Sequence, residues 1–123
     1  MAHRRIIIEC SAQENMRPPY DRDGLGDWFV NDDGDLVIRA VGSDIIADHA
    51  CFLVALHELI EMKLCHDRGI SQAAIDLFDG AFKGDGEPGD DPAAPYRQEH
   101  RFACLIEFLM AHEMGLAGYG EVR

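Results

Sequence analysis

The chain has 123 residues, 47% of them hydrophobic, which suits one domain of modest size with an ordinary core. Its 11 basic and 23 acidic residues give a formal net charge of −12, so the average surface repels nucleic-acid backbones and anionic membranes and attracts cations. No apolar run reaches the roughly 18 residues that a membrane span needs, and the isoleucines at residues 6–8 are too few for a signal peptide. We expect a single cytoplasmic domain over residues 1–123 that binds neither nucleic acid nor membrane.

Short β-branched segments near the N-terminus predict a small sheet. Residues 5–9 and 36–41 are rich in isoleucine and valine, and residues 27–31 run into the turn-forming sequence Asn-Asp-Asp-Gly-Asp. This order favours a β-hairpin in which 27–31 pairs with 35–41. We expect the first strand to join the hairpin in an antiparallel sheet, and the segment 16–26, with its prolines and glycines, to form a loop.

Three helices are predicted in the remainder of the chain. The first begins near Asp44 or Asp48 and ends at about Asp67. A short helix follows at 72–82, and a long last helix covers about 96–115. The predicted fold is therefore α+β, with a small antiparallel sheet, made of the N-terminal strand and the hairpin, packed on two long helices and one short helix.

The segment between the last two helices, residues 83–95, is an acidic loop that contains several prolines and glycines. Its length is more typical of a lid or a binding loop than of a plain connector. We expect this loop to border the functional site and to move, because its residues offer little to bury.

The four cysteines are widely spaced, and no two of them form a Cys-x-x-Cys pair. This spacing favours buried, reduced thiols over a disulfide framework or a cysteine-based zinc site. The cysteines are Cys10, Cys51, Cys65 and Cys104.

An apolar stretch from residue 50 to residue 65 carries the sequence His57-Glu58-Leu59-Ile60-Glu61. On a helix, Glu61 lies about 40° around the axis from His57 and one turn further on, so one metal ion can touch both side chains. A carboxylate in apolar surroundings is costly unless a cation or strong hydrogen bonds satisfy it. The pattern differs by one residue from His-Glu-x-x-His, in which two ligands at i and i+4 hold zinc and the intervening glutamate is the general base.

A third ligand is expected from the last helix, where His100 and Glu107 are seven residues apart, nearly aligned, and surrounded by small residues. We predict that His57, Glu61 and His100 bind zinc or another divalent transition metal and leave one position for water. Glu58 is the predicted catalytic general base. Glu107 is predicted to orient a ligand histidine through a hydrogen bond.

Ordinary structural roles remain open for each of these residues. His57 and Glu61 can form an i,i+4 hydrogen-bonded pair that holds no metal. His100 can be a surface or core histidine, and Glu107 can pair with a neighbouring arginine. The metal site and these structural roles are therefore competing interpretations of the same residues.

Five short motifs follow one another between residues 26 and 100. They are Gly26-Asp27-Trp28, Leu36-Val37-Ile38, His57-Glu58-Leu59-Ile60-Glu61, Glu87-Pro88-Gly89-Asp90 and Pro95-Tyr96-Arg97-Gln98-Glu99-His100. In this order they resemble a family of small uncharacterised proteins of phage and prophage genomes, over residues 26 to about 120, and the resemblance implies no particular activity. More loosely, a strand pair followed by an apolar His-Glu helix is similar to the active-site core of zincin metallopeptidases. That similarity puts His57 and Glu58 on the matching motif positions, while Glu61 stands where the zincin motif has its second histidine.

These observations favour a small zincin-like, metal-dependent hydrolase that acts on peptide or amide bonds, with a peptide or protein as substrate. The alternative is a non-catalytic phage accessory or binding protein, in which the same residues form a structural metal site or a buried polar network and loop 83–95 is the interaction surface. A third class, suggested by Glu58 and Glu61, is an all-helical nucleotide pyrophosphohydrolase that uses Mg²⁺, and it needs a second acidic pair on a partner helix. The histidines suit zinc better than magnesium.

Overall fold

The computed structural model describes residues 4–119, and within them it has three β-strands and three α-helices. The predicted α+β class is confirmed, and the sheet does not fit the all-helical architecture of the third class. The chain divides into two compact units, residues 1–59 and residues 60–123. The division falls within α1 (His49–Asp67), one uninterrupted helix that belongs to both units. That the two units act as a single zincin-like domain stays a prediction.

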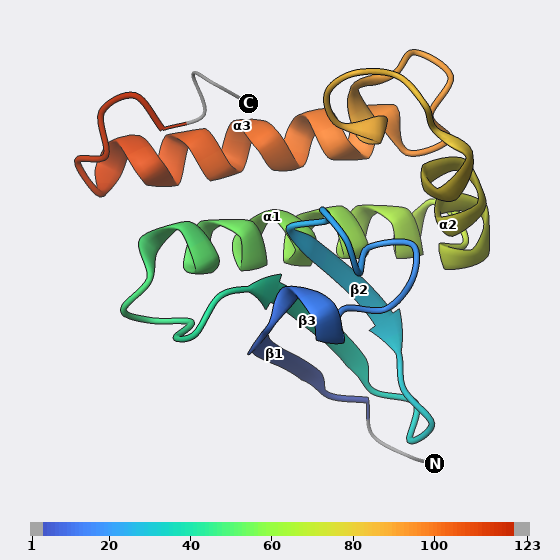
Figure 1. The fold of residues 1–123 in the computed structure, drawn as a ribbon, viewed down its shortest axis with the longest axis horizontal. Coiled ribbons are helices and arrows are strands. Elements are labelled where there is room, and N and C mark those ends of the chain that lie inside the picture. Colours follow the sequence, from blue (N-terminus) through green and yellow to red (C-terminus); the bar gives the residue numbers. More distant parts are fainter. Residues whose placement is uncertain (1–3, 120–123) are drawn as a thin grey trace. The chain divides into compact units, whose positions relative to one another are not determined.

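The N-terminal unit contains a three-stranded sheet in the order β1-β3-β2 (Figure 1). Its strands are β1 (Ile6–Ser11), β2 (Gly26–Val30) and β3 (Leu36–Val41). The predicted hairpin is confirmed, because β2 and β3 are antiparallel neighbours. In the turn between them Gly34 has a positive φ of 83°, a conformation that favours glycine, and the Asn31 side chain accepts hydrogen bonds from two backbone N–H groups of the turn.

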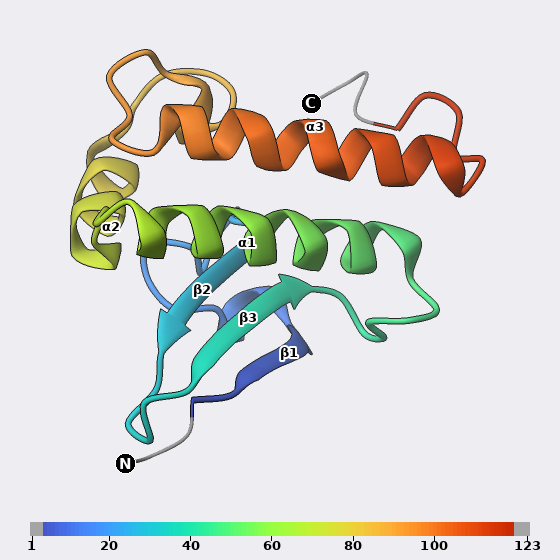
Figure 2. The ribbon, with the colours of Figure 1, turned by 180° about the vertical axis from the view of Figure 1, so that it is seen from behind.

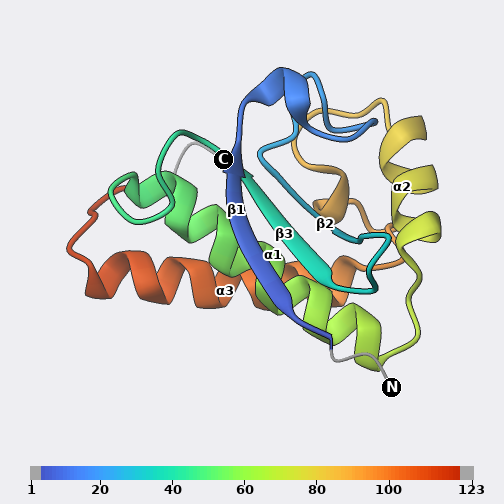
Figure 3. The same ribbon diagram turned by 90° about the horizontal axis from the view of Figure 1, so that it is seen from below.

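The prediction that the whole sheet is antiparallel is wrong, because β1 runs parallel to β3 (Figure 3). The two strands begin side by side, with Ile6 opposite Leu36. Asp35 fixes this alignment by accepting hydrogen bonds from the backbone N–H of Arg5 at 3.0 Å and from its guanidinium at 2.9 Å. A parallel pair needs a long connection, and the segment between β1 and β3, which includes β2, supplies it.

The N-terminal half of α1 packs against the sheet within this unit. Asp48 caps the helix by accepting a hydrogen bond from the backbone N–H of Cys51 at 3.2 Å, which selects the later of the two predicted starts. A Cβ atom at Gly26 would stand 2.7 Å from both Val54 Cγ1 and Glu58 Cγ. Strand β2 therefore approaches the helix closely because residue 26 has no side chain, and Glu58 is held against the strand. The buried apolar side chains of this unit include Trp28, Val37, Ile38, Ala40, Cys51 and Leu53.

The C-terminal unit contains the second half of α1, α2 (Gln72–Ala81), the short 3₁₀ helix η2 (Pro88–Asp90) and α3 (Arg97–Glu113). Figure 2 labels the three α-helices. The predicted helices are confirmed, with ends that differ by one or two residues. Ser71 caps α2 by accepting a hydrogen bond from the backbone N–H of Ala74 at 3.1 Å. The Tyr96 hydroxyl, just before α3, donates to Asp79 of α2 at 2.6 Å. No helix within residues 4–119 is long and apolar enough to cross a membrane.

Replacing Gly26 with alanine tests the close approach of β2 to α1. The added methyl group meets Val54 and Glu58 at distances that require one of them to shift. We expect Gly26→Ala to lower the free energy of unfolding by about 1–3 kcal/mol, the usual cost of overpacking. Val30→Ala is the control, because Val30 lies at the exposed end of the same strand. Equal losses in the two variants, measured by denaturant unfolding, would contradict this account of the packing.

Candidate metal centre

Helix α1 brings His57, Glu58 and Glu61 together as the spacing of the motif predicts. Each of the three offers a ligand atom, and these atoms all lie within 4.8 Å of one another. His57 and Glu61 are each only 5% exposed, and Glu58 is half-buried. The helix therefore carries two buried ionisable side chains one turn apart. Burying such groups costs free energy unless hydrogen bonds or an opposite charge satisfy them.

His100 meets Glu61 within the C-terminal unit. It lies in the first turn of α3 and is 5% exposed. Its ring nitrogen Nδ1 lies 3.1 Å from Oε2 of Glu61. Two of the three predicted ligands, Glu61 and His100, are thus in direct contact. The third, His57, lies one turn before Glu61 on α1.

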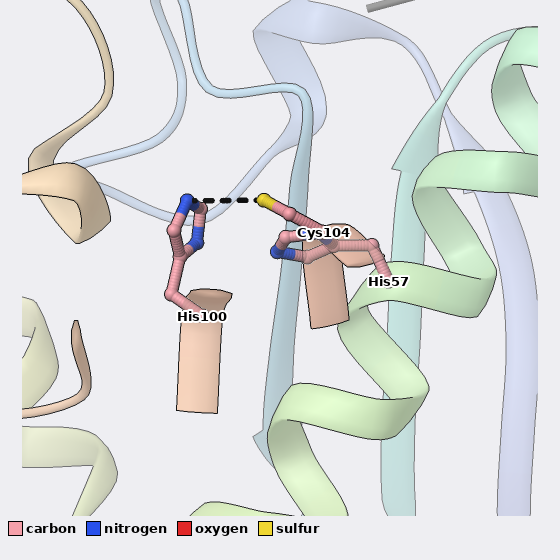
Figure 4. A group of neighbouring side chains, drawn as sticks. All are labelled: His57, His100 and Cys104. Carbon is pink, nitrogen blue, oxygen red and sulfur yellow. Dashed lines mark hydrogen bonds between the residues drawn. The ribbon is translucent and has the colours of Figure 1, made fainter. Parts of the chain in front are cut away.

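The other ring nitrogen of His100, Nε2, has partners that the sequence did not identify as site residues. Glu87 Oε2 lies 3.1 Å from this nitrogen, and Asp90 Oδ1 lies 3.2 Å from it. The Cys104 sulfur lies 3.5 Å from the same nitrogen, as the dashed line in Figure 4 marks. Loop 83–95 therefore borders His100. That the loop borders a functional site and moves stays a prediction.

None of the four cysteines forms a disulfide, as expected. Cys51 and Cys65 are buried as predicted, whereas Cys10 and Cys104 are half-buried. The Cys104 sulfur reaches His100, one helical turn away.

Gly89 explains how the loop lies so close to the histidine ring. The 3₁₀ helix η2 packs against α2 and α3. A Cβ atom at Gly89 would stand 2.5 Å from Cγ and 2.6 Å from Nδ1 of His100. Only a residue without a side chain fits against the imidazole there, so η2 forms a backing for the ring.

The electrostatic surroundings of His100 favour its charged form. Burial lowers the pKa of His100, but its hydrogen bonds with Cys104, Glu61 and Glu87 outweigh that effect and raise the pKa to about 12. Three carboxylates lie within 3.2 Å of the one ring. A proton on the imidazole is therefore favoured in the metal-free protein.

Glu107 has a hydrogen-bond partner that the sequence did not identify. Its side chain is completely buried on α3, and it accepts a hydrogen bond from the hydroxyl of Tyr119 at 2.5 Å. The carboxylates that contact His100 are Glu61, Glu87 and Asp90. The role of Glu107 in orienting a histidine stays a prediction. Glu61, Glu87 and Asp90 are close enough to His100 to orient its ring.

The donors gathered here are close enough together to hold a metal ion. One imidazole, several carboxylate oxygens and a thiol are ligands that zinc accepts. Comparisons with models of protein families, with curated proteins and with solved structures gave no match. The function is therefore inferred from the geometry of the centre.

The raised pKa of His100 predicts how the stability of the metal-free protein depends on pH. Because the folded value lies above the ordinary value of 6.5, the charged ring stabilises the fold fully below that pH, and this contribution is lost as the pH rises toward about 12. We expect the stability advantage of the wild type over His100→Gln to shrink steadily between pH about 6 and about 10 in the presence of a chelator. An advantage that stays constant in denaturant unfolding over this range would show that the ring is not held in its charged form.

Proposed function

We propose that this protein is a small zincin-like hydrolase that binds zinc, or another divalent transition metal, at a centre containing Glu61 and His100. The observation that carries the proposal is the 3.1 Å contact between Glu61 Oε2 and His100 Nδ1, because both side chains are almost fully buried. A buried carboxylate beside a buried imidazole, with further carboxylates and a thiol close by, is a donor set that binds zinc. We infer that the substrate is a peptide or amide bond in a peptide or protein.

The roles of the residues on α1 follow from the zincin resemblance and from the helical spacing. His57 lies one turn before Glu61, with ligand atoms within 4.8 Å of each other, and we propose it as a further ligand. A bound zinc ion lowers the pKa of a water molecule and polarises a carbonyl group. Glu58, half-buried and held against Gly26, is the proposed base that accepts the proton of that water and passes it to the leaving group.

The cellular setting is part of the same proposal. The ordered motifs support a phage or prophage origin. Four cysteines that form no disulfide support a reducing compartment such as the cytoplasm. The net charge of −12 supports a metal ion and a peptide, rather than a nucleic acid, as binding partners.

The competing function is a non-catalytic binding or accessory protein with a structural metal site or a buried polar network. The observation that favours it is the number of donors around Nε2 of His100, where Glu87, Asp90 and the Cys104 sulfur all lie within 3.5 Å. Four protein ligands around one zinc ion leave no position for water, which is typical of structural sites. In that case the acidic loop 83–95 serves as the interaction surface.

Substitution of the two glutamates on α1 separates a metal centre from a purely polar network. If a metal is bound, Glu61→Ala should lower metal affinity at least about tenfold, because it removes a carboxylate that either binds the ion or orients its ligand. Glu58→Gln should keep the metal, because the amide fills the same space and only the base is lost. Elemental analysis of the purified variants, together with their melting temperatures, measures both effects.

A buried polar network without metal predicts a different result for the same two variants. Each substitution would then lower the free energy of unfolding by roughly 1–3 kcal/mol, the cost of leaving a buried partner unsatisfied. Metal content would be negligible in the wild type and in both variants. If the wild type does bind metal and Glu61→Ala binds an equal amount, Glu61 is not part of the centre.

Substitution of Cys104 separates the hydrolase from a closed structural site. In the hydrolase, water occupies the remaining position, so Cys104→Ala should change zinc affinity less than about tenfold. In a closed site the thiolate is a ligand, and its loss should release the metal. Cys10→Ala is the matched control, because that thiol also forms no disulfide and is half-buried but lies in the N-terminal unit. Loss of zinc from Cys104→Ala alone would favour the structural function.

A further inference from the structure

The two ring nitrogens of His100 have different surroundings within the C-terminal unit. Nδ1 lies 3.1 Å from a carboxylate oxygen of Glu61. Nε2 has two carboxylate oxygens beside it, those of Glu87 at 3.1 Å and Asp90 at 3.2 Å. A single carboxylate matches a single N–H proton, whereas two carboxylates that converge on one nitrogen match a cation better than one proton.

We propose that the metal ion binds Nε2 of His100 together with Glu87 and Asp90, while Glu61 accepts a hydrogen bond from Nδ1. This inference rests on the metal binding of the proposed function, and it makes Glu61 the carboxylate that orients the histidine. When the ion binds, the proton on Nε2 leaves to solvent and the proton on Nδ1 stays, so the ring is neutral. Histidines that bind a metal commonly donate their second N–H to a carboxylate in this way.

The distances around Nε2 fit one ion. Two ligands at about 2.1 Å from a tetrahedral zinc lie roughly 3.4 Å apart. The separations from Nε2 to Glu87 and to Asp90 are 3.1 and 3.2 Å, and ligand atoms of all three residues lie within 4.8 Å of one another. The two distances to Nε2 are therefore within a few tenths of an ångström of the separation that a shared ion requires.

Exposure also separates the two sides of the ring. The Glu61 side chain is 6% exposed, whereas those of Glu87 and Asp90 are 33% and 67% exposed. An ion at Nδ1 would be enclosed by buried side chains, and an ion at Nε2 would be reached by water. A hydrolase needs the second arrangement, because water and the substrate must both reach the ion.

The local backbone places the two loop carboxylates on the same side. Glu87 immediately precedes η2 and Asp90 ends it, and the backbone N–H of Asp90 donates to the carbonyl of Glu87 at 3.1 Å. Side chains three residues apart in a 3₁₀ turn point in the same direction. Because Gly89 between them lies against the His100 ring, the turn presents both carboxylates to that histidine. The segment therefore has the features of a preformed ligand-bearing turn.

The test is a zinc titration of the full-length, metal-free protein against a competing chromophoric chelator. The variant Glu87→Gln with Asp90→Asn should lose more than about 100-fold in zinc affinity, because two ligands are removed, whereas Glu61→Gln should lose about 10- to 100-fold. Asp85→Asn is the matched control, since this acidic residue lies in the same loop and is exposed. It should bind zinc like the wild type.

A second measurement identifies the nitrogen directly and needs no variant. With ¹¹³Cd²⁺ in place of zinc and ¹⁵N-labelled histidine, NMR should show cadmium coupled to Nε2 of His100 and a proton on Nδ1. Coupling to Nδ1 would overturn the inference, as would a loop double variant that keeps its zinc while Glu61→Gln loses it. Either result leaves the proposed metal-dependent function standing. Absence of zinc and cadmium binding in the wild type would instead overturn both.

Discussion

The contact between the Glu61 carboxylate and the His100 imidazole is the interaction on which the C-terminal unit depends. It joins α1 to α3 across 39 positions of the sequence, and both side chains are almost fully buried. Removing two ionisable groups from water costs several kcal/mol for each, so such a pair persists only where geometry and further hydrogen bonds satisfy it. The other ring nitrogen of the histidine then needs a polar partner of its own, which another segment of the chain must provide.

The loop between α2 and α3 provides that partner, and this explains its composition. The second side of the ring faces carboxylates from this irregular segment. Glu87 and Asp90 supply the charges, and Gly89 lets the turn lie against the imidazole. The acidic character of the loop is therefore tied to His100, as well as to contact with solvent.

The N-terminal unit shows where local patterns are sufficient and where they are not. The hairpin of β2 and β3 could be predicted, because a turn sequence between two β-branched runs specifies antiparallel pairing. The direction of β1 could not, because it depends on Asp35 contacting Arg5 from 30 positions away. Gly26 is a similar case, since only the close approach of the helix explains why a side chain is excluded there. These contacts join segments that are far apart in the sequence, and the residue pattern of one segment does not predict its contact with the other.

The sequence by itself determined the class of the fold, the helices and the alignment of His57 with Glu61, because strand and helix periodicity are local properties of the chain. It also singled out His100, which the structure places beside Glu61. Only the tertiary structure decided which nitrogen of that histidine contacts Glu61 and which contacts the loop. Loop residues have no periodicity from which the direction of their side chains can be predicted. The contacts of Glu87 and Asp90 with the buried ring are therefore known only from the tertiary structure.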